Sequence, residues 1–492
     1  MLKKPLLICF LLSSLISFSQ EIVKEFDLKL EKKRDFFQIV NESKKEVVLL
    51  LNDKEKVTSI RFDETFSIKD SLSFARPERM YEEIIGYSQN ENDYFVFWGS
   101  KDRKKISSQY FNFTTKESKT NSISLELKKE KVIKELTIKN VFYLITIVKN
   151  TSILKLYISD NNGNLIEKTM DLSHLEFKNM YNNPADLYTV LTDESSEPSF
   201  QNITNDSPPS LALSAKRYKI YTYSSDEIIF TIDNTANATQ ILRVNLQNFT
   251  SDLKSIAQPK IEKGQYGSLQ FKSNSFLIDD KILQLKTNSF VLFVTISDLN
   301  GTKIKEYKVL HDQEIDFKNS DFVQESNGIH NQKIIENTEK FLRKIHNFPS
   351  ISCYKSNGVY YTILGSSVDK THYSGGMGMG APGIGMGTVG MVPVFYGTNY
   401  TVENLISYKD KIVFYTNCLF DSNFNHVKGE IKSSAFDKVR AFIEENNEIR
   451  ESVTLLTTSL YKDLILFKHN TNLYLGNYNK KNKKYQIFSF SE

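Results

Sequence analysis

Short stretches of alternating apolar and polar residues run through most of the chain and predict β-strands. Such alternation is typical of half-buried strands, whose successive side chains point to opposite faces of a sheet. The stretches come in groups of four, and the first three groups begin near residues 36, 83 and 132. Their predicted strands are Phe36–Val40, Val47–Leu51, Val57–Phe62 and Phe66–Phe74; then Glu83–Tyr87, Tyr94–Trp98, Ser107–Phe113 and Ser122–Leu127; then Val132–Ile138, Val141–Val148, Ile153–Ser159 and Leu165–Met170. Further groups are predicted over 218–256 and 275–309.

One hairpin pattern occurs twice, at residues 154–168 and 292–306. In both copies an apolar strand runs into Ile-Ser-Asp, an Asn-Gly pair follows, and alternation then resumes. Asn and Gly tolerate the positive φ that tight hairpin turns require. Ile158 and Ile296 lie 138 residues apart, which is three steps of 46. A propeller blade of four strands occupies about 40–50 residues, so the spacing indicates a propeller.

The predicted fold class is therefore all-β and β-propeller-like, with about seven blades and a range of six to eight. The chain resembles β-propellers in architecture only, because the Gly-His…Trp-Asp signature and the paired glycines of kelch blades are absent. The strand predicted at Glu21–Leu30 would complete the last blade. Helical spacing of apolar residues predicts two short helices in the C-terminal third, at Asn331–Phe348 and Ser434–Glu445. Inner strands such as Tyr94–Trp98 are almost wholly apolar, so we expect both their faces to be covered and Trp98 to be a core residue.

The first 19 residues have the pattern of a signal peptide. Lys3 and Lys4 form a basic start, Leu6–Leu12 is apolar, and Ser17 and Ser19 are small residues before Gln20. We therefore expect an exported protein, located in the periplasm, on the outer-membrane surface or outside the cell. We expect no transmembrane span in the mature chain, which would form a single domain over residues 20–492. The polar, proline-bearing segment 193–210 is an alternative domain boundary.

Charge and cysteine content narrow the chemistry. A net charge of +4 over 492 residues, with lysines interleaved among Glu and Asp, gives no indication of nucleic-acid binding. Without the signal peptide, Cys353 and Cys418 remain. Export permits a disulfide between them, and their apolar surroundings equally suit two separate buried thiols. Both alternatives are open at this point.

The most unusual segment is a Gly/Met-rich insertion at 374–391, followed by Phe395 and Tyr396. It is either a loop without regular structure or an apolar contact surface for a partner or a lipid. A Cu(I) site is a third alternative, because thioethers suit that ion. The candidate contact residues are Met377, Met379, Met386, Met391, Phe395 and Tyr396.

No other motif points to catalysis or to a cofactor. The Asp160 and Asp298 loops resemble the opening of a calcium loop, but they lack its later carboxylate, and turn geometry accounts for both residues. The seven histidines show no metal-ligand spacing, and no Gly-x-Ser-x-Gly elbow occurs. We expect no cofactor and no metal, and the catalytic residues, if the chain is an enzyme, are unknown.

The resulting hypothesis is an exported, non-enzymatic binding or scaffold protein, whose partner is another envelope protein or a glycan. The alternative is a periplasmic or extracellular hydrolase, acting for example on carbohydrate. A hydrolase predicts several Asp, Glu or His side chains converging in one pocket with shifted pKa values, and a binding protein does not.

Overall fold

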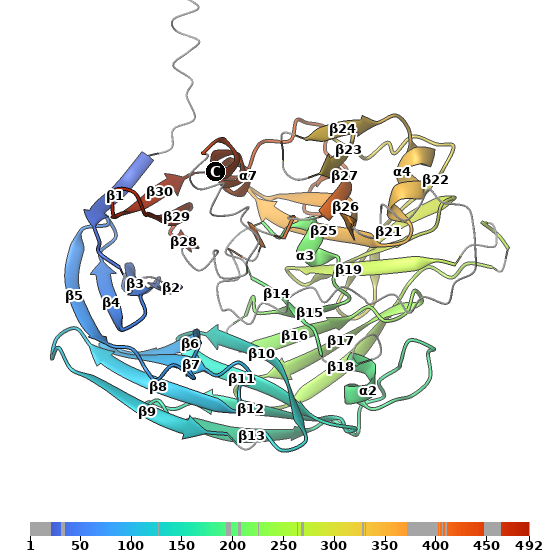
Figure 1. Cartoon of the computed structure of the whole chain (residues 1–492). Coiled ribbons are helices and arrows are strands. Elements are labelled where there is room, and N and C mark those ends of the chain that lie inside the picture. Colours follow the sequence, from blue (N-terminus) through green and yellow to red (C-terminus); the bar gives the residue numbers. More distant parts are fainter. Residues whose placement is uncertain are drawn as a thin grey trace, which may run out of the picture. The chain divides into compact units, whose positions relative to one another are not determined.

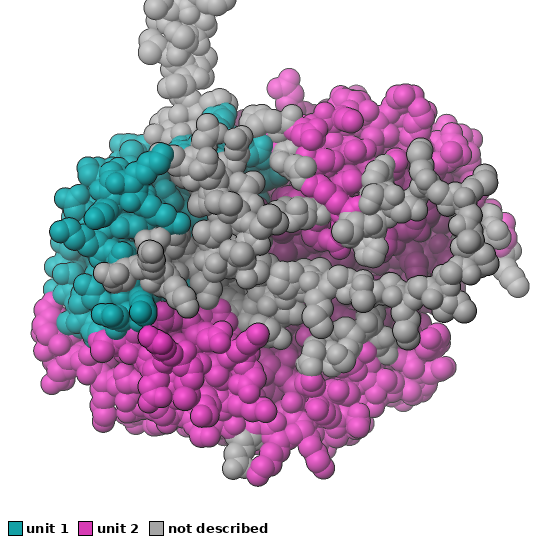
Figure 2. Space-filling model, viewed as in Figure 1, with its two compact units in different colours: residues 1–74, 433–492 teal, residues 75–432 magenta. Residues whose placement is uncertain are grey.

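The computed structural model describes residues 21–30, 35–125, 127–192, 198–204, 208–224, 226–262, 264–266, 270–326, 329, 331–370, 402, 404–405, 407–408, 411–446 and 464–491. The chain divides into two compact units, which Figure 2 colours separately. The first unit joins residues 1–74 to 433–492, and the second is the continuous segment 75–432. The predicted signal peptide lies outside the described residues. The alternative boundary at 193–210 falls within the second unit and is only partly described, so the domain organisation stays a prediction.

The first unit contains two four-stranded antiparallel sheets. One sheet is β2 (Asp35–Asn41), β3 (Glu46–Asn52), β4 (Lys56–Phe62) and β5 (Ile68–Ala75). In the other, β1 (Glu21–Asp27) pairs with β30 (Lys484–Phe490), which continues to β29 (Asn472–Asn479) and β28 (Leu464–His469). The leading strand therefore completes a sheet made by the last strands of the chain, as the sequence predicted (Figure 1).

The second unit contains five sheets, three with four strands and two with five. The first two are β6 (Glu83–Asn90), β7 (Asp93–Gly99), β8 (Lys105–Asn112) and β9 (Ser118–Ser124); then β10 (Glu130–Ile138), β11 (Val141–Val148), β12 (Ile153–Ser159) and β13 (Leu165–Asp171). The third is β14 (Gln201–Ile203), β15 (Tyr218–Tyr221), β16 (Glu227–Ile232), β17 (Ala238–Asn245) and β18 (Ser251–Ala257). The fourth is β19 (Lys272–Ile278), β20 (Lys281–Thr287), β21 (Val291–Asp298) and β22 (Lys303–Leu310). The fifth has the spatial order β24 (Gln332–Ile335), β23 (Phe322–Ser326), β27 (Lys411–Phe420), β26 (Val359–Asp369) and β25 (Pro349–Ser356).

The described residues thus form seven sheets of four or five strands, and the fold class is all-β and propeller-like. The inner strands β3, β7 and β11 are buried except at the ends of β7 and β11, as their apolar runs predicted. Every residue of β3 is buried, and Trp98 on β7 is 0% exposed. Strands covered on both faces need no polar alternation, which explains why these runs are continuous.

The repeated hairpin turns are held by a side chain. Asp160 accepts hydrogen bonds from the backbone N–H groups of Asn162 and Asn164, each at 2.8 Å. Asp298 accepts from Asn300 and Thr302 at the same distances. The glycine of each turn has positive φ, +76° at Gly163. Turn geometry therefore uses the carboxylates fully, and the part of the chain that the structure covers contains no cluster of metal-ligating side chains at these loops.

A third copy of this turn, which the sequence comparison missed, follows β27. Asp421 accepts from the N–H groups of Asn423 and Asn425, both at 2.8 Å. Its third turn position holds Phe424, at φ +58°, where the other two copies have glycine. The missing glycine hid the copy from a search for Asn-Gly.

Both predicted helices are present, with one change of bounds. Helix α7 (Ala435–Glu445) begins after Ser434, whose hydroxyl accepts from the Asp437 N–H in a capping box. Helix α4 covers only Thr338–Ile345, because Gln332–Ile335 forms β24 instead and pairs with β23. Asn337 caps α4 by accepting from the Lys340 N–H, which fixes the later start. Two further short helices, α2 (Leu187–Leu191) and α3 (Leu211–Ser214), were not predicted.

Across the described ranges, no helix has both the length and the apolar character needed to cross a membrane.

Candidate functional site

The six candidate contact residues of the Gly/Met-rich insertion, Met377, Met379, Met386, Met391, Phe395 and Tyr396, lie outside the described residues. Their role as a contact surface, and the Cu(I) alternative, therefore stay predictions.

The two cysteines are buried free thiols, which is one of the two alternatives that the sequence left open. Cys353 on β25 faces Thr362 on β26, and Thr362 in turn faces Cys418 on β27. Two strand spacings of about 4.8 Å separate the cysteine backbones by roughly 9.6 Å, beyond the reach of a disulfide. Burial raises the pKa of Cys353 to about 12 and also raises that of Cys418. Both therefore act as small apolar groups.

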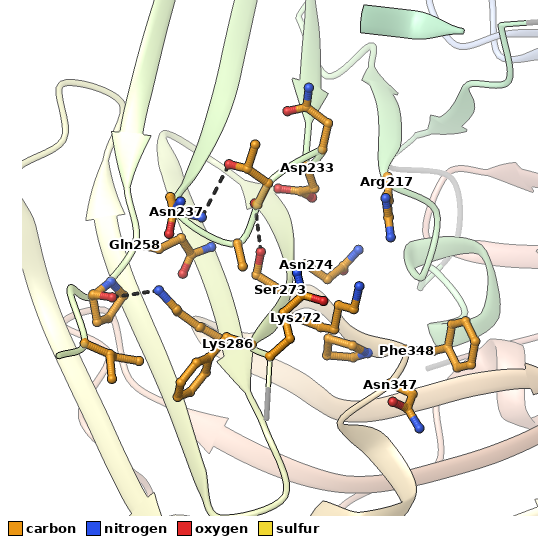
Figure 3. A pocket seen from close by; sticks show the side chains of 18 of the residues that line it. Arg217, Asp233, Asn237, Gln258, Lys272, Ser273, Asn274, Lys286, Asn347 and Phe348 are labelled. Carbon is orange, nitrogen blue, oxygen red and sulfur yellow. Dashed lines mark hydrogen bonds between the residues drawn. The ribbon is translucent and has the colours of Figure 1, made fainter. Parts of the chain in front are cut away.

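A pocket of about 950 Å³ lies in the second unit, where loops and strand ends of the third, fourth and fifth sheets of that unit meet. Its lining includes the β16–β17 turn, the segment after β18, the start of β19, the end of β20 and the start of β25 (Figure 3). Amide, hydroxyl and lysine side chains predominate among the charged and polar residues of this lining. The charged and polar residues of the lining are Arg217, Asp233, Asn234, Thr235, Asn237, Gln258, Lys260, Glu262, Gln270, Lys272, Ser273, Asn274, Lys286, Asn347 and Ser367.

Asp233 anchors one wall of the pocket through a closed network. Its carboxylate accepts hydrogen bonds from the Thr239 hydroxyl at 2.8 Å and from the Ser275 backbone N–H at 2.9 Å and hydroxyl at 2.8 Å. Lys219 completes the network at 3.3 Å, and both side chains of this ion pair are 0% exposed. Burial lowers the pKa of Lys219, and the charge of Asp233 opposes that shift. The carboxylate is thus neutralised and fully used in holding strands together.

Gln258 differs from Asp233 in having no partner for its side chain. The residue is 4% exposed, yet neither its amide oxygen nor its amide nitrogen has a hydrogen-bond partner among the described residues. Its backbone N–H donates to the Asn237 carbonyl at 2.8 Å, which ties the segment to the β16–β17 turn. An unsatisfied buried amide costs about 1–3 kcal/mol, so native structures rarely keep one without a use. The hydroxyl of Ser367, in a residue 8% exposed on β26, is a second pocket group without a partner in the described chain.

Lys286 brings a buried cation to the same wall as Gln258 (Figure 3). The residue is 4% exposed, and its ammonium donates to the Pro259 carbonyl at 2.8 Å. The ammonium also lies 5.5 Å from the centre of the Phe271 ring. Burial lowers the pKa of Lys286 to about 8. Because Pro259 directly follows Gln258, the bond places the ammonium beside the segment that carries the unpartnered amide.

Aromatic rings and two exposed apolar side chains, Met180 and Phe348, also line the pocket. Tyr266 and Phe271 line it, and Phe348, just before β25, is 53% exposed. Figure 3 draws Phe348 and Asn347 on the opposite side from Gln258 and Lys286. Exposed rings beside convergent polar groups are typical of small-ligand sites.

Carboxylates are few among the described residues that line the pocket. Of the described residues that line it, Asp233 and Glu262 carry carboxylates and none is a histidine. Asp233 is held by Lys219, Thr239 and Ser275, and Glu262 is exposed. Across the described ranges, no group of three or more His, Cys, Asp or Glu side chains could hold a metal ion.

Sequence reasoning did not single out any residue of this pocket. Lys286 lies near the end of β20, where six of the seven residues are buried. Gln258 follows a strand with no distinctive neighbours. The one usable signal was that Gln284 and Lys286 alternate with the apolar residues Leu283 and Leu285 in β20, and only the tertiary structure reveals that both are buried.

The fold and this pocket define an all-β, propeller-like protein with a polar site in its second unit. No protein-family model matches the chain, and no curated protein matches it. A mutant of Synechocystis apocarotenoid oxygenase is 9% identical with a TM-score of 0.29, and the match covers 57% of this chain and 62% of that one. The cobalt-substituted form of that oxygenase is 8% identical with a TM-score of 0.28, over the same shares. A prolyl endopeptidase is 6% identical with a TM-score of 0.27, over 67% of this chain and 45% of that one.

The chain therefore spans about three-fifths of the length of the solved structures it matches first. At these identities and scores the likeness carries no argument about activity or ligand.

Proposed function

We propose that this chain is an exported, non-enzymatic binding protein that holds a saccharide in the pocket around Gln258. The observation that carries the proposal is the buried amide of Gln258 in the pocket wall, which has no hydrogen-bond partner among the described residues. A primary amide offers two N–H donors and one acceptor, and neighbouring sugar hydroxyls offer both complements. The unpartnered hydroxyl of Ser367 and the amides of Asn237 and Asn347 extend the same chemistry around the pocket.

The aromatic residues of the pocket support a sugar over a wholly polar small molecule. The C–H-bearing face of a sugar ring packs well on an aromatic face, and Phe348 presents an exposed ring at the pocket. Tyr266 and Phe271 add further aromatic surface to the lining. A saccharide thus matches both the amides and the rings, which is why we favour a glycan over an envelope protein as the partner.

The alternative, a hydrolase acting on carbohydrate, receives less support. Glycosidases place two carboxyl groups about 5–9.5 Å apart around the scissile bond. In the described lining Asp233 is committed to its network, which leaves Glu262 as the one uncommitted carboxylate. Export rests on the sequence of residues 1–19. N-terminal sequencing of the protein recovered from the cell envelope or medium tests it, with Gln20 expected as the first residue.

Glycan-array binding by the wild-type chain, by Gln258→Leu and by Gln109→Leu tests the binding proposal. Gln109 is a matched control, since it is a buried glutamine whose amide is fully partnered and lines no described pocket. We expect saccharide binding by the wild type and by Gln109→Leu, and its loss in Gln258→Leu, with no sugar released from the bound glycan. Binding unchanged in Gln258→Leu, capture of peptides in place of glycans, or steady release of sugar would each contradict the proposal.

A further inference from the structure

The pocket has an imbalance of charge that the amide chemistry alone does not explain. Its described lining contains four cationic side chains, Arg217, Lys260, Lys272 and Lys286, and two carboxylates, Asp233 and Glu262. Lys219 already neutralises Asp233. Lys260, Lys272 and Lys286 therefore stand against Glu262, the one remaining carboxylate of the described lining, so the electrostatic potential of this lining favours an anion.

Lys286 is a buried cation of this pocket that has no carboxylate partner among the described residues. Two other buried cations of the second unit, Arg103 and Lys219, have carboxylate partners. Arg103 contacts Glu135 at 2.5 Å and Glu83 at 2.7 Å, and Lys219 has Asp233. Lys286 is 4% exposed, so its ammonium has lost most of its hydration. Its described partners are nevertheless only the carbonyl of Pro259 and the ring of Phe271.

A buried cation without a countercharge is costly, and an ammonium has three N–H donors. Pro259 takes one of them, so two remain for a ligand. The lowered pKa of Lys286 has the same physical origin, since burial removes water and no carboxylate replaces it. A ligand carboxylate at this ammonium would supply both the missing charge and the missing acceptors.

We propose that the saccharide of this pocket is acidic, a uronate whose carboxylate pairs with the Lys286 ammonium while its ring hydroxyls pair with the Gln258 amide. This inference rests on the proposed function, because it specifies the ligand class of the same site. The hydrogen bond from Lys286 to Pro259, the residue after Gln258, brings the two recognition groups to one short segment of the wall. Lys260 and Lys272 raise the local concentration of anionic chains before they dock.

The test uses the full exported chain and three uronate oligosaccharides: alginate, oligogalacturonate and hyaluronan fragments. Each is paired with its carboxyl-reduced form, which keeps the backbone but replaces the carboxylate by a neutral hydroxymethyl group. We expect at least one uronate to bind about tenfold or more tightly than its reduced form, in line with a charge-assisted hydrogen bond. In Lys286→Met this preference should disappear, while weak binding of both forms remains through Gln258. Lys286→Arg should retain part of the preference and shows that the loss in Lys286→Met does not come from misfolding.

The outcomes separate the two proposals. If neutral glycans bind in a Gln258-dependent way but no uronate exceeds its reduced form, the acidic-ligand inference is overturned and the binding function stands. If a uronate is preferred equally by the wild type and by Lys286→Met, the assignment of the carboxylate to Lys286 is overturned. If no acidic or neutral saccharide binds, the proposed function itself fails.

Discussion

Two buried glutamines of the second unit show how the same side chain serves different purposes. Gln109 on β8 is 2% exposed, and its oxygen accepts from the Trp98 indole N–H at 3.1 Å. Its nitrogen donates to the Ala75 carbonyl at 2.8 Å and to the Thr120 hydroxyl at 3.2 Å. Gln258 is 4% exposed and has none of these bonds within the described chain. Burial alone therefore does not separate the two amides, whereas the number of their hydrogen-bond partners within the described chain does.

The largest effect is expected where a fully partnered charged pair is broken. Lys219→Met leaves the Asp233 carboxylate buried without its cation, beside the Thr239 and Ser275 donors. Breaking a buried pair from one side typically costs about 3–5 kcal/mol of unfolding free energy. Urea unfolding followed by tryptophan fluorescence and circular dichroism measures the change. The double variant Lys219→Met/Asp233→Leu should recover much of the loss, and a loss no smaller in the double variant would contradict this explanation.

Gln109→Leu should come next in size. The change leaves the buried Trp98 indole N–H without its acceptor and the Ala75 carbonyl without a donor, which costs about 1–3 kcal/mol in unfolding free energy. Saccharide binding should be unchanged, since Gln109 does not line the pocket. Urea unfolding measures the predicted loss of stability, and the glycan-array assay measures whether saccharide binding is unchanged. If Gln109→Leu had the same unfolding free energy as the wild type, the number of hydrogen-bond partners would not identify the amides that stabilise this fold.

Gln258→Leu should show the opposite pattern. Because the amide has no described partner, replacing it by an apolar group of similar size should leave the unfolding free energy within about 1 kcal/mol or raise it. Binding should be lost in the same variant. If Gln258→Leu lowered the unfolding free energy as much as Gln109→Leu does, Gln258 would have a structural role. The proposed difference between the two glutamines would then be wrong.

The sequence predicts the fold better than the site for a physical reason. Strands repeat a local pattern, so alternation located most bounds of β2 to β13 within two residues, and the Asn-Gly hairpins indicated the spacing of the sheets. The end of β6 and both ends of β9 were three or four residues off. Helix α4 was overextended because Ile334 and Ile335 fit a helical period, yet pairing with β23 decided their structure. Local pattern carries this information because most of the sheets are built from neighbouring segments, although β1 pairs with β30 and β23 with β27.

The pocket depends on contacts that no local pattern records. Gln258, Lys286 and Phe348 are separated by up to 90 residues and come from three different sheets or their connections. Nothing near Gln258 in the chain indicates that its amide will be buried without a partner, while Gln109 looks similar in sequence and is satisfied. A site defined by missing partners becomes visible only when all the partners are placed.

His469 in the first unit offers the finest test, because it is unpartnered but lines no described pocket. The residue is 1% exposed at the end of β28, and neither ring nitrogen has a hydrogen-bond partner among the described residues. Phe66 and Tyr474 surround it, with ring centres 6.0 and 6.4 Å away. Burial lowers the pKa of His469 below its usual value of 6.5, although Glu42 and Glu64 oppose the shift and Lys45 adds to it.

The folded state therefore disfavours protonated His469. The unfolded chain takes up the proton first, so this contribution to stability is fully present above pH 6.5 and is lost as the pH falls through 6.5 toward the lower folded pKa. We expect the unfolding free energy of the wild type to decrease between about pH 7 and pH 5, and His469→Leu to show a smaller decrease over that window. Urea unfolding of both proteins at a series of pH values measures the difference. Saccharide binding by His469→Leu at pH 7 should equal that of the wild type. If the unfolding free energy had the same pH dependence in both proteins, His469 would not be buried as a neutral group. If His469→Leu lost saccharide binding, a buried side chain without described partners would affect binding even where it lines no described pocket.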